Sequence, residues 1–192
     1  MKLTKTDYQS AQFEELAGVK ENFAGKTFEN CDFRNSGFMN ADLSDAIFIT
    51  CTFQNCDFTV TKLHSTRLQG VKFTDCRVQG IDFRNCQQLF LSVSFEKCSI
   101  SNCGFSDLDL ENAKFESCSI LETDFFKSNL RHASFRNSEF RDCIMDSADL
   151  SFSDFRQAAG YAIDPTKSRI TKARFSLPEA VSLLKHLEID LS

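Results

Sequence analysis

This 192-residue chain contains nine cysteines, which are its most reactive side chains. Clustered thiolates can bind zinc, form disulfides or act as nucleophiles. The sequence also offers three histidines and 27 acidic residues, which could supply general acids and bases. Whether any of these groups converge depends on the spacing of the cysteines, which stand at positions 31, 51, 56, 76, 86, 98, 103, 118 and 143. With one exception those spacings are multiples of five, so the cysteines follow a repeat.

The repeat is a large apolar residue at every fifth position. Its first run is Phe23, Phe28, Phe33, Phe38, Leu43, Phe48, Phe53, Phe58, Leu63, Leu68, Phe73, Val78 and Phe83. The register then slips by two residues and resumes as Phe90, Phe95, Ile100, Phe105, Leu110, Phe115, Ile120, Phe125, Leu130, Phe135, Phe140, Met145, Leu150 and Phe155. Tyr8 and Phe13 fit the first register but Gly18 does not, which leaves open whether residues 1–22 add a coil.

The positions around each large residue, called i, predict its backbone. Position i−2 is small or apolar, and the flanking positions are mostly polar. Asn and Asp are common at i+2, where they suit a tight turn. A helix needs apolar spacings of three and four, and a flat strand needs a spacing of two. A period of five instead indicates a short extended segment with i−2 and i inward, followed by a corner.

This pattern places the cysteines at i−2, where a small buried core residue is the expected role. A linear stack cannot supply the four convergent ligands that zinc needs. Stacked cysteines would also have parallel Cβ directions, which disfavours disulfides. His64 and His132 point outward with no nucleophile beside them, and no phosphate-binding loop is present. We therefore expect no catalytic residues, no cofactor, no metal and no enzyme activity.

Two segments carry a resemblance to a known family. Ala41-Asp42-Leu43-Ser44-Asp45 and Ala148-Asp149-Leu150-Ser151-Phe152 are near copies of the motif Ala-(Asp/Asn)-Leu-X-X, so the chain resembles the pentapeptide-repeat family. The resemblance implies an all-β fold, a right-handed quadrilateral parallel β-helix with four repeats per coil, here with a small C-terminal helical cap. Nearly seven coils at ~4.8 Å each would give a length on the order of 32 Å.

Four repeats per coil sort the residues into four faces. The Phe-ladder face contains Phe33, Phe53, Phe73, Phe95, Phe115, Phe135 and Phe155. The Cys face, next to it, has Ser36, Cys56, Cys76, Cys98, Cys118 and Ser138 at i−2. The first acidic face is centred on Phe23, Leu43, Leu63, Phe83, Phe105, Phe125 and Met145, and the second acidic face on Phe28, Phe48, Leu68, Phe90, Leu110, Leu130 and Leu150. Such columns of like residues are typical of stacked coils.

Charge divides unevenly among these faces. Counted at i−1 and i+1, acids exceed bases on the two adjacent acidic faces, whereas the other two faces are close to balanced. The candidate partner-binding acids are Asp42, Asp82, Asp109, Glu111, Asp124, Asp146 and Asp149. The net charge of −5 argues against direct nucleic-acid binding. Since no signal peptide or membrane-spanning run is visible, we expect a cytoplasmic protein.

The sequence predicts a boundary at Gln157, with the repeat domain at 1–157 and a cap at 158–192. Within the cap, Tyr161–Ile170 indicates two short strands around Asp164-Pro165. Ser176 and Glu179 form a capping box for a helix to about Leu187, and 189–191 alternates like a strand. Apolar residues beyond the needs of one cap predict a homodimer through Phe175, Leu183, Leu184, Leu187 and Ile189.

The register slip within 84–94 should bulge from one corner and bring Leu89 or Leu91 near the surface. It is either a tolerated insertion or a contact with a partner, and the sequence leaves both open.

The tail from Ala173 to Ser192 resembles that of the subgroup containing the albicidin-immunity (AlbG-type) protein, near relatives of the Qnr and MfpA quinolone-protection proteins. That resemblance implies a dimeric, acidic, DNA-shaped rod that interacts with DNA gyrase or topoisomerase IV and protects it from poisons. The alternative is a structural or scaffolding protein with an unrelated partner, because a repeat fold by itself does not define a partner.

Overall fold

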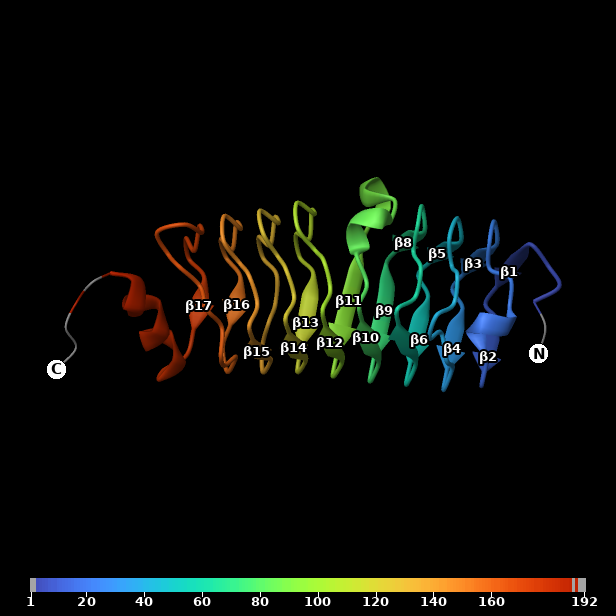
Figure 1. Ribbon diagram of the computed structural model, residues 1–192, viewed down its shortest axis with the longest axis horizontal. Helices are drawn as coiled ribbons and strands as arrows, with labels where there is room; N and C mark the ends of the chain where they lie inside the picture. Colours follow the sequence, from blue (N-terminus) through green and yellow to red (C-terminus); the bar gives the residue numbers. More distant parts are fainter. Residues whose placement is uncertain (1–2, 188, 190–192) are drawn as a thin grey trace.

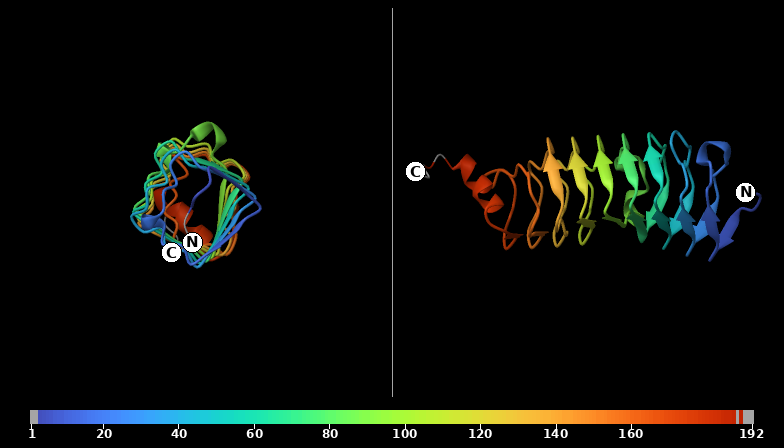
Figure 2. Two further views of the ribbon diagram at one scale, coloured as in Figure 1. Left: turned by 90° about the vertical axis from the view of Figure 1, so that its right-hand side faces the viewer. Right: turned by 90° about the horizontal axis from the view of Figure 1, so that it is seen from below.

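The protein forms an all-parallel β-helix of about eight turns, which confirms the predicted fold class. It is described here from a computed structural model, which defines residues 3–187 and residue 189. The coils stack along one axis with the two chain ends at opposite ends of the rod (Figure 1). Viewed along that axis, the successive coils superpose as a four-sided outline (Figure 2).

The Phe-ladder face carries the longest sheet, six strands in the order β13-β11-β9-β6-β4-β2. Their bounds are β2 Gln12–Glu14, β4 Asp32–Arg34, β6 Thr52–Gln54, β9 Val71–Thr74, β11 Val93–Glu96 and β13 Lys114–Glu116. Phe33 pairs with Phe53 and Phe53 with Phe73, a repeat of 20 residues per coil. Phe73 then pairs with Phe95, so the two extra residues are absorbed without disturbing this face.

Two other faces form shorter sheets. The Cys face has five strands: β7 Asp57–Thr59, β10 Arg77–Gln79, β12 Ser99–Ser101, β14 Ser119–Leu121 and β15 Glu139–Arg141. The second acidic face has four: β1 Asp7–Gln9, β3 Thr27–Glu29, β5 Ile47–Ile49 and β8 Arg67–Gln69. Beyond β8 the second acidic face continues as isolated bridges. The coils of the first acidic face are also joined by isolated bridges.

A left-handed backbone turn ends most repeats. Most non-glycine residues at i+2 have φ between 47° and 63°, as at Asn35, Asn55 and Asn137, and the exceptions Asn85 and Ser92 flank the insertion. Asn and Asp tolerate this conformation better than other non-glycine residues, which accounts for their frequency there. The predicted corners are therefore confirmed. Thr50 and Val60 adopt the same φ despite their β-branched side chains.

Stacked aromatic rings fill one side of the core. The phenylalanines of the Phe-ladder face lie with ring centroids 4.7–5.3 Å apart and with nearly parallel planes. Phe13 and Phe175 extend the predicted ladder by one rung at each end, at 4.7 and 5.3 Å. Many buried rings also meet rings of adjacent faces edge-on, as Phe105 meets Phe115 at 88°. Offset stacks and edge-to-face pairs are the favoured aromatic geometries.

Small polar side chains at i−2 satisfy the backbone of the coil beneath. The Thr66 hydroxyl donates to the Leu43 carbonyl at 2.8 Å, and the Cys76 thiol donates to the Phe53 carbonyl at 3.3 Å. Eight of the nine free cysteines are buried, as predicted, whereas Cys143 is half-buried near the open C-terminal coils. Burial raises the pKa of the Cys86 thiol to about 12 and that of Cys103 to about 11.

The β-helix is longer than the sequence predicted. At the N-terminal end, β1 and β2 pair with β3 and β4 and Phe13 is buried, so the segment before Phe23 does contribute a coil, described from residue 3 onward. A short 3-10 helix, η1 (Gly18–Lys20), occupies the corner where Gly18 breaks the period. At the C-terminal end, β16 (Asp154–Phe155) pairs with β17 (Arg174–Phe175), so coil architecture continues past Gln157. Eight coils correspond to roughly 38 Å of axial length.

Two predictions for the C-terminal segment, the strand pair and the capping box, are wrong, whereas the predicted helical cap is present. Residues 161–170 form no strand pair; they complete a coil in which Tyr161 and Ile163 are buried. The cap is a 3-10 helix, η4 (Glu179–His186), whose N-cap residue is Pro178. Ser176 makes no capping box, because its hydroxyl accepts a hydrogen bond from the Gln157 amide at 3.2 Å instead. The strand predicted at 189–191 lies largely outside the described residues.

The two-residue slip changes the second acidic face. After η2 (Phe83–Asn85) the chain loops outward as η3 (Gln88–Phe90), which projects from the rod in Figure 1. Phe90, predicted to point inward, is instead 36% exposed, and its ring packs under the Arg67 guanidinium at 3.8 Å. Leu91 takes its place against the core. Within the described residues, no helix is long and apolar enough to cross a membrane.

Removing one rung of the aromatic ladder should destabilise the whole rod. Phe115 is fully buried, so Phe115→Ala should lower the free energy of unfolding by ~3–5 kcal/mol. Gln54→Ala, at an exposed position, should change it by less than about 0.5 kcal/mol. Chemical denaturation of both variants provides the measurement, and comparable losses would mean that the inward register is misassigned.

Thiol labelling should separate Cys143 from the other eight cysteines. At neutral pH the native protein should show one faster-reacting thiol, and denatured protein should show all nine, because burial limits access to the others. Cys143→Ser should abolish the faster phase. Several fast thiols in the native protein would contradict the burial of position i−2.

Candidate interaction surfaces

The candidate acids lie outward on the two acidic faces. Asp42, Asp109 and Glu111 are exposed, whereas Asp82, Asp124, Asp146 and Asp149 are half-buried. They come from different coils, so stacking brings together residues that are far apart in the sequence. Asp124 lies between Gly104 and Ile144 in the bridge ladder of the first acidic face.

Most of these aspartates also have a structural role. The Asp42 carboxylate accepts the Ser44 amide at 3.0 Å, and Asp124 accepts the Phe126 amide at 2.8 Å. Asp109 accepts the Glu111 amide at 3.2 Å in the same way. Where a face lacks regular strands, the amide at i+1 has no ladder partner, and an Asp or Asn at i−1 supplies the acceptor. The acidity of these faces is therefore partly a consequence of their backbone.

Ion pairs neutralise three of the seven acids. Asp82 binds Arg84 at 2.7 Å, and Asp146 binds Lys167 at 3.0 Å. Asp149 lies 3.4 Å from Arg131 and 3.5 Å from Arg169. The hydrogen bond from Arg84 lowers the pKa of the Asp82 carboxyl. The remaining four, Asp42, Asp109, Glu111 and Asp124, form no ion pair with a described residue.

The count of charged residues at i−1 and i+1 missed a corner position that adds to the negative charge of the two acidic faces. Asp107 stands at i+2 between the two acidic faces, where its φ is 59° and its side chain is exposed. It connects Asp109 and Glu111 on one face with Asp124 on the other. We call Asp107, Asp109, Glu111 and Asp124 the acidic band. Counting the i+2 corners as well as the face positions would have identified it.

Apolar side chains interrupt the first acidic face on the C-terminal side of the band. Phe126 is 36% exposed and Ile144 is 51% exposed, in adjacent coils. Lys127 lies over the Phe126 ring at 4.9 Å. On this face the acidic band therefore ends at an apolar patch on its C-terminal side.

The two other candidate sites differ in accessibility. At the insertion, Leu89 is 86% exposed, whereas Leu91 is half-buried against the core. In the cap, Phe175 stacks on Phe155 and Leu183 packs against the core, so both also stabilise their own chain. Leu187 and Ile189 are 45% and 51% exposed, and Leu177 and Val181 join them at 80% and 42%.

Comparison with known proteins agrees with the coil geometry. Two family models match, the pentapeptide repeat region over residues 26–105 and the pentapeptide repeats (8 copies) over residues 123–158. The stacked five-residue turns define a solenoid repeat protein, and this chain belongs to the pentapeptide-repeat family. No curated protein sequence matches it.

Solved structures share the fold at low sequence identity. Full-length QnrB1, a plasmid-mediated fluoroquinolone resistance protein, is 19% identical with a TM-score of 0.57, covering 95% of this chain and 100% of that chain. HetL, a pentapeptide repeat protein involved in heterocyst differentiation regulation in the cyanobacterium Nostoc sp., is 16% identical with a TM-score of 0.29, covering 88% and 87%.

The structural role of the surface aspartates can be tested at Asp124. Asp124→Asn keeps an oxygen acceptor for the Phe126 amide and should leave stability within about 0.5 kcal/mol of wild type. Asp124→Ala removes the acceptor and should cost about 1 kcal/mol. Urea denaturation of the two variants gives the comparison; equal stabilities would mean that the carboxylate contributes charge alone.

Proposed function

We propose that the protein is a DNA mimic that binds a type II topoisomerase, DNA gyrase or topoisomerase IV, and protects it from topoisomerase poisons, in the manner of the Qnr, MfpA and AlbG-type proteins. The observation that carries the proposal is the acidic band, four carboxylates on the side of a narrow rod that form no ion pair with a described residue. A surface that receives the DNA duplex is positively charged and grooved. An acidic rod of stacked coils fits such a surface in both charge and shape.

Charge alone does not account for the proposed mimicry. Duplex DNA carries one negative charge per ~1.7 Å of axis, and the rod is less densely charged. Complementarity of shape must therefore supply part of the affinity. Electrostatic attraction would mainly increase the rate of association and would weaken as salt rises.

The cap supports a second part of the proposal, a homodimer. In a 3-10 helix, positions three apart share a face. Ala180, Leu183 and His186 face the β-helix, where His186 lies 3.7 Å from Asp164. Val181, Leu184 and Leu187 therefore lie together on another face, of which Val181 and Leu187 are exposed. Two such faces joined about a twofold axis would double the length of the rod.

Gyrase assays test the proposed function. Purified protein should compete with DNA for gyrase and raise the ciprofloxacin concentration needed to inhibit supercoiling. Asp107→Asn, Asp109→Asn, Glu111→Gln and Asp124→Asn together should weaken binding about tenfold or more, since they remove the unpaired charge and retain the backbone acceptors.

A matched variant controls for net charge. Asp32→Asn, Asp75→Asn, Glu96→Gln and Glu116→Gln remove four charges from the Phe-ladder face and its corner, and should leave gyrase binding close to wild type. Equal effects of the two sets would assign binding to overall charge. An inert wild-type protein would favour the alternative, a structural or scaffolding protein with an unrelated partner.

Dimerisation is tested by Val181→Glu with Leu187→Glu, which places charge on the outer face of η4. Sedimentation should show a dimer for wild type and a monomer for the double variant, because burial of unpaired carboxylates is unfavourable. Leu89→Glu, at the other exposed apolar site, should remain dimeric. A wild-type protein that is monomeric at micromolar concentration would rule out the dimer.

A further inference from the structure

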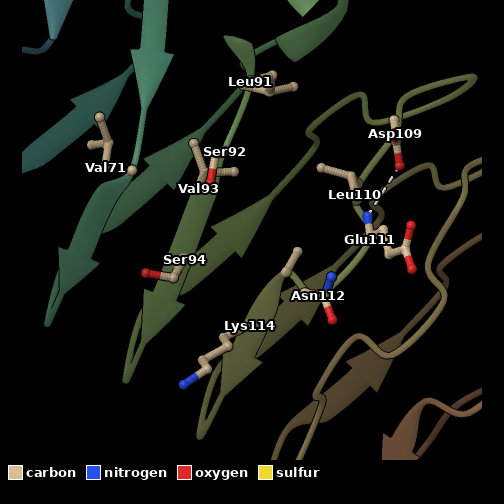
Figure 3. A pocket seen from close by; sticks show the side chains of 12 residues that line it. Val71, Leu91, Ser92, Val93, Ser94, Asp109, Leu110, Glu111, Asn112 and Lys114 are labelled. Carbon is tan, nitrogen blue, oxygen red and sulfur yellow. Dashed lines mark hydrogen bonds between the residues drawn. The ribbon is translucent and has the colours of Figure 1, made fainter. Parts of the chain in front are cut away.

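A break in the β-ladder lies beside the insertion, on the second acidic face. On that face each coil normally contributes one extended segment, a rung, which forms hydrogen bonds with the rungs of the coils before and after it. Between Leu68 and Leu110 no regular rung forms, because Gln88–Phe90 loops outward as η3. On the Leu68 side the Ser92 amide donates to the Leu68 carbonyl at 2.8 Å, so the gap lies between Ser92 and the coil of Leu110. A cavity of about 350 Å³ remains, lined by Gly70, Val71, Leu91–Ser94 and Asp109–Lys114. Figure 3 shows Ser92 and Val93 on one side of this gap and Asp109, Leu110 and Glu111 on the other.

The walls of the gap carry backbone groups without partners. One coil further along, the Asn129 carbonyl accepts the Leu110 amide at 2.8 Å, and the Arg131 carbonyl accepts the Asn112 amide at 2.9 Å. The equivalent carbonyls of Asp109 and Glu111 accept no hydrogen bond from a described residue. The carbonyls of Asp109 and Glu111 are two residues apart, which is the spacing of acceptors along one edge of a β-strand.

Donors are also free on both sides. Asn129 donates its amide to the Leu108 carbonyl at 2.9 Å, whereas the equivalent Asp109 amide has no partner among the described residues. On the opposite wall, Thr50 donates to the Gln69 carbonyl at 2.8 Å, and the equivalent Gly70 amide is likewise unpaired. Unpaired backbone groups on facing edges are the requirement for adding a strand.

We propose that this gap, the ladder slot, binds an extended basic segment of a partner protein by strand addition. Two amides of the segment, two residues apart, donate to the carbonyls of Asp109 and Glu111. Its carbonyls accept the amides of Asp109 and Gly70. The residue whose amide donates to the Asp109 carbonyl is equivalent to Leu110, so its side chain points inward and must be small, because Leu91 already occupies the floor.

Charge selects the sequence of the segment. The Asp109 and Glu111 carboxylates stand exposed at the rim and form no ion pair with a described residue. Outward-facing Lys or Arg residues on both sides of the small residue would meet them. The predicted ligand is therefore an extended basic–small–basic segment, and the slot is a site distinct from duplex mimicry, although it shares two residues with the acidic band.

Selection from a phage-displayed random heptapeptide library tests the proposal. Clones that bind the wild type should be enriched in the basic–small–basic pattern. Deletion of Gln88 and Leu89 restores the five-residue spacing between Phe83 and Phe90, so the missing rung should fill the slot and weaken binding of the selected peptides at least tenfold. Leu89→Ser keeps the insertion and should bind as wild type does.

A second arm does not depend on the folding of the deletion variant. Methylating the two donor amides of a selected peptide should weaken binding at least tenfold, and the unmethylated peptide should slow hydrogen exchange at Gly70 and Asp109. No enriched peptide, equal binding by the deletion variant, or equal binding of methylated peptides would overturn the proposal. Since the deletion retains all four acidic-band carboxylates, its effect on peptides and any effect on gyrase are separable.

Discussion

A left-handed backbone turn that recurs every five residues outside the insertion is the constraint on which the rest of the structure depends. It bends the extended segment through a corner, and four such corners close a coil of 20 residues. Equivalent residues then stack on one another, so a residue type that fits one rung fits the next. The phenylalanine ladder and the small side chains at i−2 both follow from this, because each position meets its own copy along the axis.

The same geometry limits how surface charge can be used. On faces without regular strands the amide at i+1 needs an acceptor, and aspartate at i−1 provides it. The resulting acids are spaced by the coil and anchored by hydrogen bonds, so they form a rigid array. A rigid array loses little side-chain entropy on binding, which favours recognition by shape and charge together. Arg84, Arg131, Lys167 and Arg169 then remove part of that charge and leave the acidic band in the middle of the rod.

Two extra residues have consequences well beyond one corner. The Phe-ladder face passes the insertion with its pairing intact, whereas the second acidic face loses a rung. On its N-terminal side that face is a four-stranded sheet, and on its C-terminal side it is a series of single bridges. The insertion therefore produces both an exposed protrusion, with Leu89 at its surface, and the open ladder edges beside Asp109 and Glu111. Interruptions of a regular solenoid are where individual proteins of such a fold can differ from one another.

The period of five determined the coil, its inward residues, its corners and the assignment of residues to faces, because each depends on spacing along the chain. Tertiary structure decided what depends on contacts between coils. Asp149 and Arg131 are 18 residues apart, and their pairing across coils cannot be inferred from a local repeat. Phe90 fits the period yet lies outside, on a backbone that loops outward, and its ring contacts the guanidinium of Arg67 from the preceding coil. Residues 158–175 lack the motif yet complete a coil, because stacking on the rung beneath, as Phe175 stacks on Phe155, stabilises a sequence that the period alone does not identify.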